Sequence, residues 1–106
     1  MLKQITEDYF RAFQNKDIKQ IRNLLSLNVS LRDWEFEVTG LDSVMLIYKR
    51  IFKNANAIQV DLFNLNIRGS IVMAELSIVI DDLPILRVVD VLEYSSNGKI
   101  KAPGLS

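Results

Sequence analysis

The stretch IVMAELSIVIDDLPILRVVDVLEY, residues 71–94, predicts two antiparallel strands joined by a hairpin. Every second residue is apolar from Val72 to Ile80, and from Leu86 to Tyr94 every second residue is apolar or aromatic except Asp90, while the sequence DDLP at 81–84 is typical of a turn. A period of two places successive side chains on opposite faces of a sheet, so each strand can turn one face toward a core. We therefore expect an antiparallel sheet in the second half of the chain.

The segments on either side extend this sheet. Residues 58–67 alternate in one phase as far as Leu62 and in the opposite phase from Phe63, which predicts a bulge in a long bent strand. Beyond the hairpin, the turn sequence SSNG leads to a short strand over residues 99–102, which Pro103 stops. The expected arrangement is a meander of antiparallel strands.

Helical spacing dominates the first half of the chain. Apolar residues three and four positions apart over residues 2–14 predict an amphipathic helix. Asp17, followed three residues later by Gln20, resembles a capping box, so a short second helix is expected to begin there. Residues 29–38 then alternate with a period of two, and their phase slips around residues 33–35, which indicates a bulge, a bend or a short loop.

A third helix is the clearest in the chain. Residues 44–52 carry apolar side chains on one face, Gly40 ends the preceding segment, and Asp42 or Ser43 is the predicted cap. Helices followed by an antiparallel meander make the fold class α+β, with the helices covering one face of the sheet. We expect residues 1–106 to form a single domain, because two domains of half this length would each be too small to bury a core.

The composition excludes several classes of function. The 106 residues contain no His and no Cys, which rules out Ser-His-Asp and Cys-His catalysis, thiol redox chemistry and the usual zinc sites, and we expect no metal. Because 13 Lys and Arg balance 13 Asp and Glu, no broad positive field attracts nucleic acid. The longest apolar run has four or five residues, too few to cross a membrane. We expect a soluble, cytoplasmic protein that binds neither membrane nor nucleic acid.

Asp90 is the sharpest anomaly, because a carboxylate on an apolar strand face is costly unless it is protonated, paired or hydrogen-bonded. Loss of hydration raises the pKa of a carboxyl and favours the neutral acid, which can donate a hydrogen bond. A structural aspartate, satisfied by backbone donors or by Arg32 or Lys99, is an equal alternative. The predicted strand face of Asp90 is shared by four apolar or aromatic residues, Leu86, Val88, Leu92 and Tyr94.

Asp33 and two tyrosines complete a candidate cluster. Asp33 ends an apolar face where the strand changes phase, and it either lines a cavity or begins a turn before Trp34. Tyr9 and Tyr48 lie on the buried faces of their predicted helices, where an aromatic residue is usually part of the core. If these groups converge with Asp90 between the helices and the sheet, they form a polar cluster inside an apolar pocket.

Four segments together resemble the SnoaL-like branch of the nuclear-transport-factor-2-like superfamily. They are YFRAFQNKD at 9–17, the strand ending in Asp33, TGLDSVMLIYKRIF at 39–52 and VVDVLEYSSNGKI at 88–100. The resemblance extends over nearly the whole chain. It implies a cone, in which a strongly curved, mostly antiparallel sheet wraps around three N-terminal helices and encloses a pocket at its open end.

Within that superfamily the chain resembles ketosteroid isomerase. The resemblance implies that Tyr9 and a neutral Asp90 stabilise an oxyanion while Asp33 acts as the general base, with no cofactor. It also implies that the ligand is a small apolar ketone and that the protein forms a homodimer through the sheet. The residues expected to contact the substrate or support the oxyanion site are Tyr48, Trp34, Phe13 and Leu92.

Two other interpretations stay open. The same polar groups could form a satisfied network in a non-catalytic domain that binds a small ligand. An exposed row of Ile85, Val89 and Val91 could instead make the chain a dimerisation module. The absence of His excludes the histidine-dependent dehydratases and polyketide cyclases, and residues 87–90 give no convincing Asp-Arg-Asp site of an epoxide hydrolase. Pro103 interrupts the strand that walls the pocket in the family.

Overall fold

The computed structural model describes residues 1–32 and 37–104, and its elements follow the order that the sequence predicts. The helices and strands are, in chain order, α1 (Leu2–Gln14), α2 (Ile18–Leu24), β1 (Ser30–Arg32), β2 (Glu37–Thr39), α3 (Leu41–Asn54), β3 (Ile58–Arg68), β4 (Ile71–Ile80), β5 (Leu86–Tyr94) and β6 (Ile100–Ala102). Strands β3, β4, β5 and β6 form one antiparallel sheet in that order, and β1 pairs with β2 separately.

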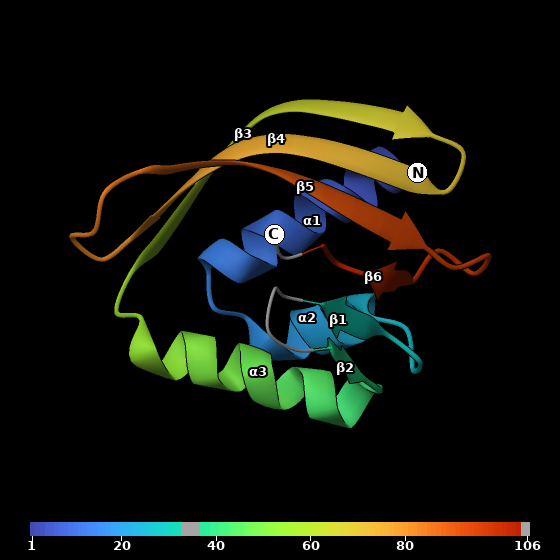
Figure 1. The fold of residues 1–106 in the computed structure, drawn as a ribbon, viewed down its shortest axis with the longest axis horizontal. Coiled ribbons are helices and arrows are strands. Elements are labelled where there is room, and N and C mark those ends of the chain that lie inside the picture. The colour runs from blue at the N-terminus through green and yellow to red at the C-terminus, as the bar shows by residue number, and fades with distance from the viewer. Residues whose placement is uncertain (33–36, 105–106) are drawn as a thin grey trace.

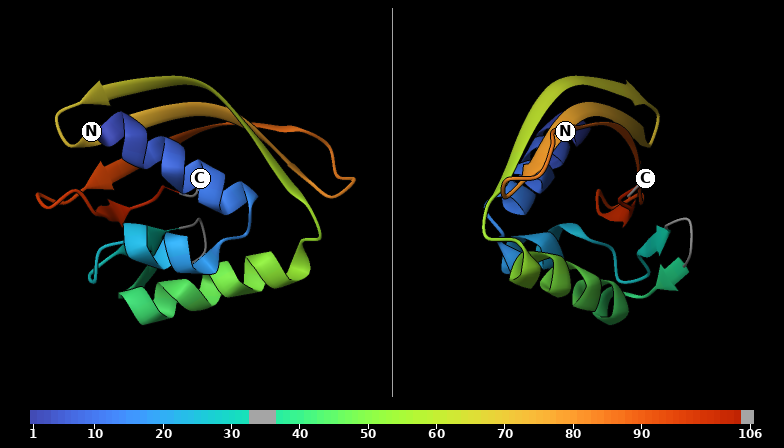
Figure 2. Two further views of the ribbon diagram at one scale, coloured as in Figure 1. Left: turned by 180° about the vertical axis from the view of Figure 1, so that it is seen from behind. Right: turned by 60° about the vertical axis from the view of Figure 1, so that its left-hand side comes forward.

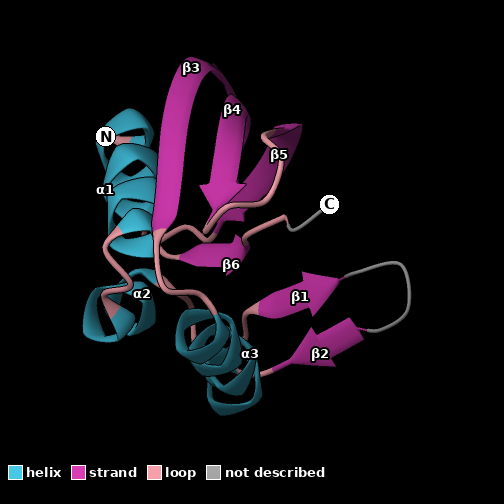
Figure 3. Ribbon diagram, turned by 90° about the vertical axis from the view of Figure 1, so that its left-hand side faces the viewer, coloured by secondary structure: helices cyan, strands magenta, loops and turns pink. Residues whose placement is uncertain are grey.

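The four-stranded sheet is curved and arches over α1, while α2 and α3 lie on the far side of that helix (Figures 1 and 2). Part of the curvature has a local cause in β3, whose register against β4 shifts between Leu62 and Asn64. This shift is the bulge that the change of phase predicts, and a bulge bends and twists its strand. In a third view, the β1–β2 pair stands apart from the larger sheet, next to α3 (Figure 3).

The two faces of the sheet have different surroundings. On β4, Val72, Ala74 and Leu76 are fully buried toward the helices, whereas Ile71 and Met73 are exposed on the outer face. Strand β5 alternates in the same way over residues 89–94, so the predicted period of two is confirmed over residues 71–76 of β4 and 89–94 of β5. The core therefore lies between the inner face of the sheet and the helices.

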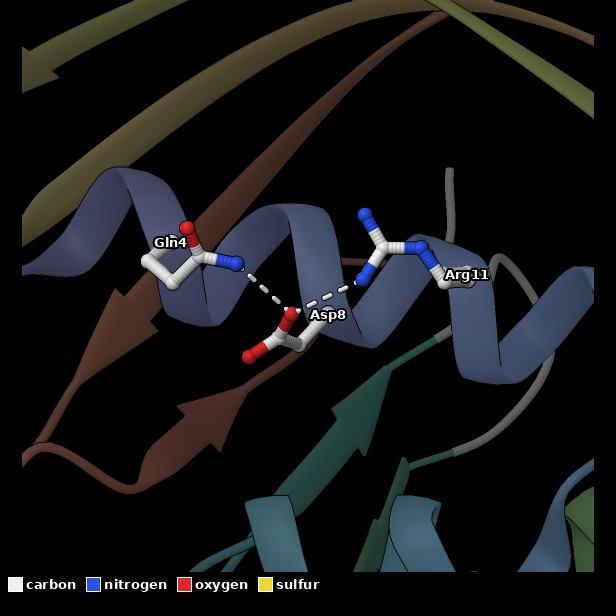
Figure 4. A network of polar contacts seen from close by, with 3 residues as sticks. All are labelled: Gln4, Asp8 and Arg11. Atoms are coloured by element: carbon white, nitrogen blue, oxygen red, sulfur yellow. Dashed lines mark hydrogen bonds and ion pairs between the residues drawn. The ribbon is translucent and has the colours of Figure 1, made fainter.

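Helix α1 is amphipathic, as its spacing predicts. Tyr9 and Phe13 are buried on the core side. On the opposite side, Asp8 Oδ1 accepts hydrogen bonds from Gln4 Nε2 at 2.9 Å and from Arg11 Nη1 at 3.1 Å (Figure 4). Exposed ion pairs contribute at most about 1 kcal/mol, so burial of the apolar side is what holds this helix on the sheet.

Helix α2 begins where the capping box predicts. Asp17 is its N-cap, and the carboxylate accepts a hydrogen bond from the backbone N–H of Gln20 at 3.2 Å. The preceding residue, Lys16, has a φ of 55° and donates from Nζ to the carbonyl oxygen of Ala55 at 2.6 Å. The tight corner between α1 and α2 is thereby tied to the end of α3.

The prediction that Asp42 or Ser43 caps α3 is wrong. The N-cap is Gly40, which has a φ of 102°, and no side chain caps the helix. The N–H of Gly40 donates to the carbonyl oxygen of Val29 at 2.8 Å, so a tertiary backbone bond fixes where the helix starts. Asp42 lies in the first turn, where a negative charge interacts favourably with the helix dipole.

No helix in the described parts of the chain is long and apolar enough to cross a membrane.

The final strand is short and covers one end of β5. Strand β6 pairs with the last two residues of β5, and the buried Pro103 follows it. Gly104 then packs closely on β5, where a Cβ atom would lie 2.1 Å from the carbonyl oxygen of Val91. The end of the described chain therefore runs beside the strand that carries Asp90.

Candidate functional site

Two tyrosine hydroxyls meet in the core between α1 and α3. The oxygen atoms of Tyr9 and Tyr48 are 2.6 Å apart, and the two rings pack edge to face with their centroids 6.4 Å apart. Both residues are buried, with 2% and 0% of their surface exposed. The hydrogen bond supplies the polar partner that a buried phenol requires.

The carboxyl group of Asp90 enters the same interior from the inner face of β5. The residue is 4% exposed and lies opposite Ala74 of β4. Burial is the largest cause of the raised pKa of Tyr9 and of Tyr48, and a Coulombic interaction with Asp90 adds to it for both, so the Asp90 carboxyl group lies within electrostatic reach of the two hydroxyls. We call Tyr9, Tyr48 and Asp90 the polar cluster; of the other predicted site residues, Phe13 packs against it through Tyr48.

The two cations that the sequence offers as partners of Asp90 bind other groups. Arg32 Nη2 lies 3.2 Å from a carboxylate oxygen of Glu37. Lys99 Nζ donates to the backbone oxygen of Asn23 at 2.5 Å. Both cations therefore have partners of their own on the surface.

Burial controls the protonation of both tyrosines. Loss of hydration is the largest cause that raises the pKa of Tyr9 well above the ordinary value of 10.0, and interactions with Tyr48 add to it. Burial likewise raises the pKa of Tyr48, although the hydrogen bond with Tyr9 opposes the shift. Both phenols therefore stay neutral near pH 7 and keep a proton that they can donate.

A second buried hydroxyl pair, which is not among the predicted site residues, joins α1 to β5. Thr6 Oγ1 and the hydroxyl of Tyr94 are hydrogen-bonded, and Thr6 Oγ1 also donates to the backbone oxygen of Leu2 at 2.8 Å. Burial raises the pKa of Tyr94. A signal was present in the sequence, because Thr6 precedes Tyr9 by three positions and therefore shares its side of a helix.

Apolar side chains surround the polar cluster. The ring of Phe13 packs edge-on against Tyr48 with centroids 6.4 Å apart, and against Phe52 at 5.5 Å. Leu92 is fully buried and follows Asp90 by two positions on the inner face of β5. The polar cluster therefore lies in a water-poor environment, where hydrogen bonds and charge interactions are stronger than in water.

Two predicted site residues, Asp33 and Trp34, lie outside the described residues. Five surface hollows of about 330 to 670 Å³ are bounded by described residues, and none of them is lined by Tyr9, Tyr48 or Asp90. These five hollows are bounded by residues within 1–32 and 37–104. In the same ranges, no three acidic side chains gather closely enough to hold a metal ion.

The comparison with family profiles decides which family the chain represents. The profile of the SnoaL-like domain matches residues 2–91, which is most of the chain. The protein belongs to the SnoaL-like domain family. The resemblance drawn from the sequence is thereby confirmed. A search of the curated proteins finds no match for this SnoaL-like domain.

Solved structures show the fold of this SnoaL-like domain. It superposes on the epoxide hydrolase/cyclase-like enzyme SalBIII with a TM-score of 0.83 and 20% identity, covering 95% of this chain and 85% of that one. An NTF2-like protein of unknown function from Cytophaga hutchinsonii ATCC 33406 gives 0.80 at 10% identity, with 96% and 85% covered. A candidate ketosteroid isomerase from Kribbella flavida DSM 17836 gives 0.78 at 16% identity, with 95% and 73% covered. The predicted NTF2-like fold is therefore confirmed.

The protonation of the tyrosines gives a prediction for alkaline pH. The chain has three tyrosines, and burial raises the pKa of each above 10.0 in the folded state. Unfolded tyrosines ionise near pH 10, so the folded state binds more protons above that pH. The free energy of unfolding should therefore be unaffected by these groups below about pH 10 and should fall as the pH rises further.

Absorbance at 295 nm, which reports tyrosinate, measures this directly. We expect the folded SnoaL-like domain to show little tyrosinate at pH 10 and to gain it together with the loss of its circular dichroism at higher pH. The same chain in concentrated urea is the control and should titrate near pH 10. Ionisation of two or three tyrosines near pH 10 in the folded protein would contradict the burial described above.

Proposed function

We propose that this SnoaL-like domain is a cofactor-independent enzyme that enolises a small apolar ketone and moves its carbon–carbon double bond, as ketosteroid isomerases do. The observation that supports this most directly is the polar cluster. A pair of neutral phenols 2.6 Å apart, with a buried carboxyl group beside them, is a set of hydrogen-bond donors suited to an oxygen atom that gains negative charge.

In the proposed reaction, Asp33 takes a proton from the carbon next to the carbonyl group. The electron pair of that C–H bond forms a new C=C bond, and the carbonyl electrons move to oxygen to give an enolate. Protonated Asp33 then returns the proton to the far end of the conjugated system, so the double bond has moved and no atom is gained or lost. Tyr9 and neutral Asp90 donate hydrogen bonds to the enolate oxygen more strongly than to the ketone, which lowers the barrier.

The hydrogen bond between the phenols explains how Tyr9 can still serve as a donor. Two hydroxyls carry two protons, and the contact between their oxygens uses one of them. When Tyr48 donates to Tyr9, the proton of Tyr9 is directed to another acceptor. In this arrangement Tyr48 orients Tyr9 and strengthens it as a donor, because linked hydrogen bonds polarise one another.

A second candidate function has an observation in its favour. The described hollows are not lined by the polar cluster, so the cluster could be a satisfied network in a domain that only binds a small ligand or a partner. Such a network stabilises a unique core without catalysis. The two functions differ in whether a base next to the cluster acts on a bound ketone.

Hydrogen exchange tests the enzymatic proposal. The probes are a panel of small β,γ-unsaturated ketones, beginning with cyclohex-3-enone, incubated in D₂O and followed by NMR for deuterium uptake and for the conjugated product. Asp33→Asn should slow both by about 10²–10⁴-fold, because an amide cannot accept the proton. Asp61→Asn, at an exposed position on β3, is the matched control and should react like the wild type.

Two results separate the functions. Equal activity in the Asp33→Asn variant and the wild type would show that Asp33 is not the base. Binding of the ketones to the wild type without deuterium uptake would favour the ligand-binding domain.

We further propose that the outer face of the sheet pairs with a second copy of the chain. Phe63, Met73 and Val91 are each about half exposed there, at 53%, 46% and 45%. The guanidinium of Arg87 lies 4.6 Å from the centre of the Phe63 ring and 3.4 Å from a carboxylate oxygen of Glu75. An apolar patch bordered by both signs of charge is self-complementary, as a two-fold interface requires.

The oligomeric state tests this surface. We expect sedimentation equilibrium to give twice the chain mass for the wild type. Met73→Lys places a charge in the centre of the patch and should give the monomer mass. Leu46→Lys introduces the same charge at an apolar position of α3 that is 64% exposed and distant from the sheet face, so it should remain dimeric. A monomeric wild type, or a dimeric Met73→Lys variant, would contradict the assignment of this face.

A further inference from the structure

We infer that Thr6 and Tyr94 are positioning residues, which hold α1 against β5 so that Tyr9 on the helix and Asp90 on the strand form one site. The inference rests on the proposed function, since it assigns these two residues to the geometry of the proposed oxyanion site. Neither residue belongs to the polar cluster, and neither is expected to touch a substrate.

The direction of the hydrogen bond between them follows from the neighbouring carbonyl group. Thr6 Oγ1 donates to the backbone oxygen of Leu2 at 2.8 Å, and a threonine hydroxyl has a single proton. The proton shared between Thr6 and Tyr94 therefore comes from the tyrosine, which donates while Thr6 accepts. Both hydroxyls are satisfied, and Thr6 is fully buried, so the bond is protected from competition with water.

The residue spacing on α1 and on β5 places the Thr6–Tyr94 bond on the same faces as Tyr9 and Asp90. Thr6 and Tyr9 are three positions apart on α1, which places them on one side of the helix. Asp90 and Tyr94 are four positions apart on β5, which places both on its inner face. Burial is the largest cause of the raised pKa of Tyr9, and smaller Coulombic interactions with Asp90 and Tyr94 add to it, which agrees with both strand residues facing the side of the helix that carries Tyr9.

The packing of α1 shows why such a link matters. The helix packs mainly on β3 and to a lesser extent on β4, while Asp90 is on the next strand of the sheet, β5. Apolar contacts are non-directional and allow small sliding or rotation of a helix, whereas a buried hydrogen bond fixes a distance. A displacement of about 1 Å in a catalytic group can cost about 10²-fold in rate, so a bond that fixes α1 relative to β5 has a catalytic consequence.

Threonine variants separate positioning from simple stabilisation. Thr6→Val keeps the shape of the side chain and removes the acceptor of the Tyr94 proton, whereas Thr6→Ser keeps the hydroxyl. We expect Thr6→Val to lower kcat for cyclohex-3-enone by about 10–10²-fold with little change in KM. Thr6→Ser should restore most of the rate, because the hydrogen bond re-forms.

A second readout does not depend on turnover. The proton shared by Tyr9 and Tyr48 is buried in a bond with 2.6 Å between oxygens, so it should give a downfield, slowly exchanging proton NMR signal. We expect this signal to shift or broaden in Thr6→Val and to be unchanged in Thr6→Ser. Tyr94→Phe leaves the bond from Thr6 to Leu2 in place and should act like Thr6→Val. It therefore replaces Thr6→Val as the test variant if the valine variant does not fold.

The outcomes distinguish this inference from the proposed function. If the wild type turns over no ketone, the proposed function fails, and the NMR signal alone decides whether Thr6 and Tyr94 position Tyr9. If Thr6→Val and Tyr94→Phe lower only the stability, with the signal and kcat as in the wild type, the positioning role is overturned.

Discussion

The hydrogen bond between Tyr9 and Tyr48 constrains how the helices and the sheet can assemble. A phenol hydroxyl cannot be left without a partner in an apolar interior, so α1 and α3 have to bring the two oxygens to 2.6 Å from one another. The curved sheet must then close over this pair (Figure 1), which places Asp90 of β5 in the same interior. The polar cluster is thus a product of three elements that are distant in sequence.

Burial of the polar cluster opposes folding, and the same burial makes its groups stronger hydrogen-bond donors. Water-poor surroundings raise the pKa of both tyrosines and keep them as neutral donors, and they strengthen the electrostatic effect of each donated hydrogen bond. The fold itself carries less information about function, because similar structures of low identity include an epoxide hydrolase/cyclase-like enzyme and a protein of unknown function. The choice between catalysis and binding therefore depends on the chemistry of the cluster and on whether a base acts beside it.

Local patterns in the sequence were sufficient to predict most of the fold. Alternation over residues 71–94 and the change of phase at Phe63 predict the hairpin and the bulge, since both follow from the period of a strand. The cap of α3 could not be predicted, because a tertiary bond from Gly40 fixes it. Asp90 was recognisable as a polar residue on an apolar face, whereas the pairing of Thr6 with Tyr94 depends on how the helix lies across the sheet.

A crystal structure of the protein with 2-naphthol tests the central claim most directly. The deprotonated naphthol has a planar, conjugated oxyanion like that of an enolate, so it should bind with its oxygen within hydrogen-bonding distance of the Tyr9 hydroxyl and the Asp90 carboxyl group. The Tyr9–Tyr48 bond should persist in that complex. A naphthol bound elsewhere, with no contact to Tyr9 or Asp90, would contradict an oxyanion site at this place.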